Sequence, residues 1–100
     1  LLTPRPVSPE ELARRKRTVE AKITRTRRHY EFVIARHDLQ TAFIADTIEY
    51  LSGLEKPPAT RIATLQAQLV KAADEKSLII QERDGELAEL EGELKLVVGG

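Results

Sequence analysis

The sequence contains no cysteine, methionine or tryptophan, and only four of its 100 residues are aromatic. Without cysteine, the chain can form no disulfide framework and no thiolate metal site. The scarcity of large aromatic side chains argues against a compact globule with a thick core. No apolar run approaches the roughly 20 residues of a membrane-spanning helix. We therefore expect no membrane span, and a location in the cytoplasm or within a macromolecular particle.

Charge is balanced overall but not along the chain. Sixteen Lys and Arg residues oppose sixteen Asp and Glu residues, so no net field draws the protein toward nucleic acid or membranes. Residues 1–40 carry ten basic and five acidic residues, whereas residues 41–100 carry six and eleven. The two parts therefore have net charges of +5 and −5.

The first local signal is the start of a long helix. Ser8 is a typical helix N-cap, Pro9 suits the first helical position, and Glu11 completes a Ser-x-x-Glu capping box. No further proline or glycine occurs until Gly53. The sequence therefore predicts a helix from about 9 to 54, roughly 69 Å long.

A break and a second helix follow. The segment around 55–60 contains Pro57 and Pro58, which cannot continue a helix. Thr60 is a candidate N-cap for a second helix over about 61–97.

The chain ends are predicted from proline and glycine. Two prolines in residues 1–7 predict an extended N-terminal arm, and the glycines at 99–100 predict the end of the second helix. Residues 8–98 then form a single helical unit.

Each predicted helix carries an apolar seam in which spacings of three and four residues alternate, as in coiled coils. The first seam comprises Leu12, Val19, Ile23, Tyr30, Val33 or Ile34, Ile44, Ile48 and Leu51. The second comprises Ile62, Leu65, Leu69, Ala73, Ile80, Leu87, Leu90 and Leu94. Because a short loop joins them, we predict an all-α fold: a long, antiparallel, coiled-coil-like two-helix hairpin within a helical oligomer or larger assembly.

An antiparallel hairpin brings the basic segment of the first helix beside the acidic end of the second. Folding about residue 57 places Lys22 near Glu93 and Arg28 near Leu87. Helical projection directs Arg15, Lys16, Lys22 and Arg27 toward the second helix. The charge asymmetry would then favour the antiparallel orientation.

Four further arginines project to the far side of the first helix, at about 140–220° from its seam. They are Arg14, Arg17, Arg25 and Arg28. The same side continues with Phe32, Leu39, Phe43 and Tyr50. A row of large apolar residues outside the core is typical of a partner surface, so these eight residues are the candidate partner-binding site. The alternative is that the rings merely widen the seam.

No residue pattern indicates catalysis, a cofactor or a metal. The only histidines, His29 and His37, have no partnering His or Cys and suit metal binding poorly. Glu82, Glu86, Glu89 and Glu93 form a row, but no Glu-x-x-His motif faces it. We expect neither enzymatic activity nor a small-molecule substrate.

The sequence thus predicts a non-enzymatic structural or assembly subunit that works through protein–protein contacts. Its partners would be other copies or a larger protein, as in a virus or phage particle or a secretion apparatus. The alternative is a nucleic-acid-binding accessory protein, in which the arginines of the first helix contact phosphates and Tyr30 or Phe32 stacks on bases.

Overall fold

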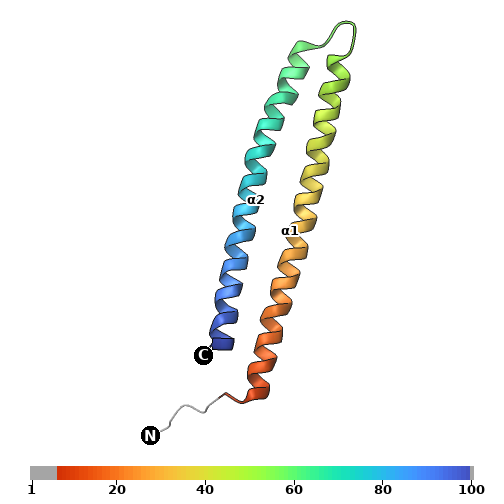
Figure 1. Cartoon of the computed structure of the whole chain (residues 1–100). Helices are drawn as coiled ribbons and strands as arrows, with labels where there is room; N and C mark the ends of the chain where they lie inside the picture. The colour runs from red at the N-terminus through yellow and green to blue at the C-terminus, as the bar shows by residue number, and fades with distance from the viewer. Residues whose placement is uncertain (1–6, 100) are drawn as a thin grey trace.

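The computed structural model describes residues 7–99, which form two long helices. Helix α1 spans Pro9–Ser52 and helix α2 spans Ala59–Gly99. The two helices lie side by side and run in opposite directions, so that the start of α1 and the end of α2 lie at the same end of a rod (Figure 1). The rod measures 84 × 21 × 16 Å. The predicted antiparallel helical hairpin is therefore confirmed. Residues 1–6 of the arm predicted over residues 1–7, and the final Gly100, lie outside the described residues.

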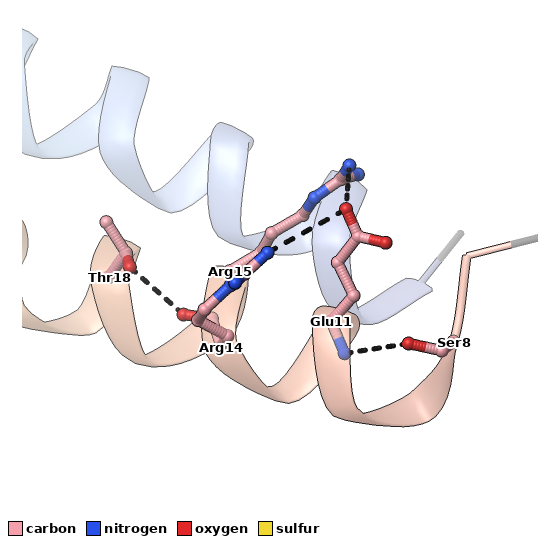
Figure 2. A network of polar contacts seen from close by, with 5 residues as sticks. All are labelled: Ser8, Glu11, Arg14, Arg15 and Thr18. Carbon is pink, nitrogen blue, oxygen red and sulfur yellow. Dashed lines mark hydrogen bonds and ion pairs between the residues drawn. The ribbon is translucent and has the colours of Figure 1, made fainter.

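Only one of the two contacts expected of the predicted capping box forms at the start of α1. The Ser8 hydroxyl oxygen accepts a hydrogen bond from the Glu11 backbone N–H at 3.2 Å (Figure 2). The Glu11 carboxylate contacts the Arg15 guanidinium at 2.9 Å. An i, i+4 ion pair thus replaces the expected return contact to the Ser8 backbone.

The turn between the helices differs in detail from the prediction. Helix α1 ends at Ser52, and the Gly53 N–H is shared between the carbonyls of Glu49 and Tyr50, both at 3.2 Å. A shared N–H of this kind is common at helix ends.

The expected Thr60 cap is wrong, because α2 has already begun at Ala59. The Pro58 carbonyl accepts the first intrahelical bond, from the Ile62 N–H at 3.0 Å. The second helix also continues through Gly99 instead of ending near residue 97, since no glycine among the described residues adopts the positive φ that commonly ends a helix.

The core is a single narrow row between the helices. Its buried side chains are Val19, Ile23, Tyr30, Leu65 and Ala72. Ala72 takes the place predicted for Ala73, which is exposed. Ala72 lies seven residues after Leu65, and this spacing keeps it on the same side of the helix. Among the described residues no side chain is less than 2% exposed, so the hairpin buries little on its own.

Ion pairs between the helices confirm the antiparallel register. Lys22 lies 3.9 Å from Glu93, as the sequence predicts, and Arg27 lies 3.7 Å from Glu91. Arg15, which was expected to reach α2, binds Glu11 on its own helix instead.

Candidate functional site: the outer face of the first helix

The large apolar residues of α1 that lie off the seam point into solvent. The exposed fractions are 67% for Phe32, 73% for Leu39, 73% for Phe43 and 69% for Tyr50. These four residues, here called the apolar stripe, extend over about 27 Å of an unbroken helix. They do not widen the seam, because side chains that packed between the helices would be shielded by α2. A contiguous apolar row of this length outside a core is typical of a contact surface.

The four arginines of the far side continue the same face toward the N-terminal end of α1. Arg14, Arg17, Arg25 and Arg28, here called the arginine stripe, are all exposed. Figure 2 shows the contact between Arg14 and the Glu11 carboxylate. The two groups are 4.0 Å apart, and Arg14 keeps 72% of its side chain in solvent. Within residues 7–99, no carboxylate lies within 4.0 Å of the other three.

Six of the nine basic residues of α1 therefore form two sets that face in different directions. Lys22 and Arg27 turn toward α2 and are partly neutralised by its carboxylates. The arginine stripe points away from α2 and keeps its charge available. Together, the arginine and apolar stripes make up what we call the α1 outer face.

Several acidic residues of α2 contact α1 across the hairpin. Glu93 pairs with Lys22 and Glu91 with Arg27, and Glu86 lies near enough to Tyr30 to act on its phenol. Burial of Tyr30 is the main cause that raises the pKa of its phenol, and the neighbouring carboxylates of Glu86 and Glu82 raise it further. Because Tyr30 is buried between the helices, it is not available to stack on a nucleic-acid base.

The two histidines lie in different environments. His37 is largely buried in the seam, with Nε2 3.8 Å from the Glu75 carboxylate and with Nδ1 lacking a hydrogen-bond partner. His29 is exposed and meets the ring of Tyr30 edge to face, with ring centroids 5.1 Å apart. Residues 7–99 contain no group of three or more His, Asp and Glu side chains placed to hold a metal ion.

A second set of exposed apolar residues was not anticipated from the sequence. Val70, Leu78, Leu96 and Val98 on α2 are 66%, 58%, 78% and 61% exposed. Helical projection from the second seam could have found Val70 and Leu78, which fall on the side of α2 that faces away from α1.

Neither helix of residues 7–99 combines the length and the apolar character needed to cross a membrane.

Comparisons with protein-family models, with curated proteins and with solved structures each gave no match. The function of the chain therefore has to follow from its own residues.

Proposed function

We propose that this protein is a non-enzymatic assembly subunit that binds other protein through the α1 outer face. One observation carries the proposal: Phe32, Leu39, Phe43 and Tyr50 expose 67–73% of their surface in a single row. Water-exposed rows of this kind are costly and are normally covered by a partner. The arginine stripe beside the row would add orientation and long-range attraction.

The energetics favour the apolar stripe as the source of affinity. Fully burying a Phe or Leu side chain is worth about 1.5–3 kcal/mol, so two or three such residues can supply several kcal/mol before ordering costs. An exposed ion pair contributes only about 0.2–1 kcal/mol. The arginines alone could therefore not hold a stable complex, but they can select its partner.

The shape of the chain supports a role inside a multi-copy particle. The hairpin is 84 Å long with a core only one row wide, so neighbouring molecules would supply burial that the chain does not supply itself. A virus or phage particle, or a secretion apparatus, is the setting that we assign to such a rod.

A nucleic-acid-binding role is the second candidate, and the exposed charges of Arg17, Arg25 and Arg28 favour it. It has less support because the end of α2 that lies beside the arginine stripe is acidic. Residues 77–99 hold six acidic and two basic residues. A phosphate backbone near the stripe would experience that negative field as well.

Hydroxyl-radical footprinting separates the two functions. Oxidation of Phe32, Phe43 and Tyr50 would be measured by mass spectrometry in the cells that produce the protein and on the purified chain at high dilution. Buried Tyr30 serves as the internal reference, because its exposure is low in both samples. We expect the three rings to be protected in the cell, with the protection surviving nuclease treatment. Protection that nuclease abolishes would favour the nucleic-acid role, and equal oxidation in both samples would refute both.

A further inference from the structure

The side of α2 opposite its buried residues forms a second outward surface. Its residues recur every three or four positions and are exposed throughout: Ala63, Ala67, Val70, Asp74, Leu78, Gln81, Gly85, Ala88 and Gly92. We call these residues the α2 outer face. The two helices lie side by side along the rod (Figure 1). Since each outer face lies opposite the buried residues of its own helix, the α1 and α2 outer faces point to opposite sides of the molecule. Each helix thus has one seam toward its own partner helix and a second, similarly spaced row on the far side.

The charges of α2 complement those of the α1 outer face. Residues 77–99 carry six acidic and two basic residues, whereas residues 59–76 carry two and three. Within the acidic part, Glu82 and Glu89 lie at about 240–260° from the seam and so lean toward the α2 outer face. No Lys or Arg side chain of residues 7–99 lies within 4.0 Å of either carboxylate.

The register of the hairpin fixes which residues of α1 and α2 lie at the same position along the long axis of the rod, here called their height. Lys22 is level with Glu93, and Asp38 is level with Lys76. Arg25 therefore stands at the height of Glu89. A second rod that stood beside the first in the same orientation would keep these heights. Its acidic end would face the arginine stripe, and its Ala63–Leu78 stretch would face the apolar stripe.

The α2 outer face also offers room for large side chains at the heights where α1 presents them. An added Cβ at Gly85 or Gly92 would meet no atom within 4 Å, so the surface there is open. Phe32 stands level with the interval between Gln81 and Gly85, and Tyr50 with the interval between Ala63 and Ala67. Large residues facing small ones allow close approach of two helices.

We propose that the partner of the α1 outer face is the α2 outer face of a second copy of this chain, standing alongside in the same orientation. This inference rests on the proposed function, because it names the protein that covers the apolar stripe. Charge complementarity decides between this and other arrangements of two copies.

Alternative arrangements bring like charges together or leave opposite charges apart. Two α1 outer faces packed in parallel would place one arginine stripe on the other. A second copy turned upside down would bring residues 59–76, which have a net charge of +1, against the arginines. Only the upright neighbour sets the arginine stripe against the part of α2 with a net charge of −4.

This contact joins two different surfaces, so every added copy leaves one α1 outer face and one α2 outer face free. Such head-to-tail contacts either close into a ring or continue as an open row. A row of upright rods would form a layer of alternating α1 and α2 helices.

Charge exchange between copies tests the inference. Arg25→Glu and Glu89→Lys should each weaken self-association of the full chain by about tenfold or more, measured by sedimentation velocity across a concentration series. Mixing the two variants in equal amounts should restore association, since Glu at position 25 then faces Lys at position 89 of the neighbour. Glu55→Lys, which makes the same charge change in the distant turn, is the matched control and should associate like the unmodified protein.

Cysteine pairing tests the orientation, because the chain contains no cysteine of its own. Ala21→Cys and Gly92→Cys lie on the α1 and α2 outer faces at similar heights and leave both stripes intact. Mixed single variants should form an Ala21→Cys/Gly92→Cys disulfide, whereas Ala21→Cys with Ala67→Cys should not. The inference is overturned if Glu89→Lys associates normally or if Ala21→Cys pairs mainly with itself.

The outcomes for this inference and for the proposed function are distinguishable. A purified chain that stays monomeric at every concentration refutes self-association. If footprinting still shows the rings protected in the cell, the α1 outer face binds a different protein and the proposed function stands. If the rings are unprotected in the cell, the proposed function fails as well.

Discussion

The Nζ atom of Lys76 lies 2.6 Å from Oδ1 of Asp38, which ties the middle of α2 to the middle of α1. Both side chains are partly exposed, at 38% and 49%, so the pair should be worth about 0.2–1 kcal/mol. We expect a double-mutant cycle of Asp38→Asn and Lys76→Gln, followed by urea unfolding, to give a coupling in this range. The coupling should fall with added salt. Strict additivity of the two changes would mean that the pair contributes nothing to the register.

The apolar stripe should be dispensable for the fold of a single hairpin. Phe32→Ala together with Phe43→Ala should leave the helix content of the dilute chain unchanged, because both rings are exposed. The free energy of unfolding should stay within about 0.5 kcal/mol of that of the unmodified protein. The matched control, Ile23→Ala, removes a buried side chain and should cost about 2–5 kcal/mol. Circular dichroism during urea titration measures both. Loss of helix in the Phe double variant of a chain that is already monomeric would place the rings in the hairpin's own core.

Tyr30 should lose its proton at higher pH than a free phenol, whose pKa is 10.0. The sequence contains two tyrosines, so Tyr50→Phe leaves Tyr30 as the only phenol that contributes to the alkaline absorbance change. We expect its midpoint above pH 10, and a lower midpoint when Glu86→Gln removes the neighbouring charge. A midpoint unchanged by Glu86→Gln would show that the Glu86 contact does not act on this group.

The same shift sets a direction for stability. A pKa that is higher in the folded chain than in the unfolded chain means that the folded chain binds more protons above pH 10. The contribution of Tyr30 to stability is therefore complete below about pH 10 and is lost as the pH rises through its folded pKa. Tyr30→Phe removes the titrating group, so its unfolding free energy should fall less steeply in alkali. A parallel decline in both proteins would contradict this linkage.

Gly85 and Gly92, which lie in the interior of α2, should limit the stability of the hairpin. Gly85→Ala and Gly92→Ala should each stabilise the dilute chain by about 1 kcal/mol, because neither added methyl group meets another atom within 4 Å. If the α2 outer face docks on a second copy, the same changes should weaken self-association, because the added methyl groups would keep the two helices further apart. A general loss of stability could not raise the free energy of unfolding and weaken self-association at the same time. Improved association in both variants would argue against docking at this face.

Large residues and helix breakers made most of the fold predictable. Pro57 and Pro58 located the turn, and the spacing of Val19, Ile23 and Tyr30 located the buried side of α1. Bulky side chains contrast strongly with their polar neighbours, so their period is easy to detect in a sequence. The exposure of the apolar stripe followed from the same period.

The sequence predictions were wrong where neighbouring residues are alike in size and polarity, or where one side chain had two possible partners nearby. Ala72 and Ala73 are identical in the sequence, and only the packing of α2 shows which of them is buried. Glu11 could bind either the Ser8 backbone or the Arg15 guanidinium, and a charged neighbour four residues away prevailed. The identity of the docking partner was not predictable from one chain, because it depends on how the faces of separate molecules meet.

Because α1 and α2 are nearly equal in length, the turn lies a full helix length away from the open end of the rod. Helix α1 begins and helix α2 ends at the open end, and the turn that joins Ser52 to Ala59 lies at the opposite tip. About 41 residues of helix separate that tip from the open end, a reach of roughly 60 Å. If the open end were anchored, a tilt of about 5° there would carry the tip sideways by about 5 Å over that reach. Small adjustments at the base of such a molecule would thus be amplified into displacements at its tip.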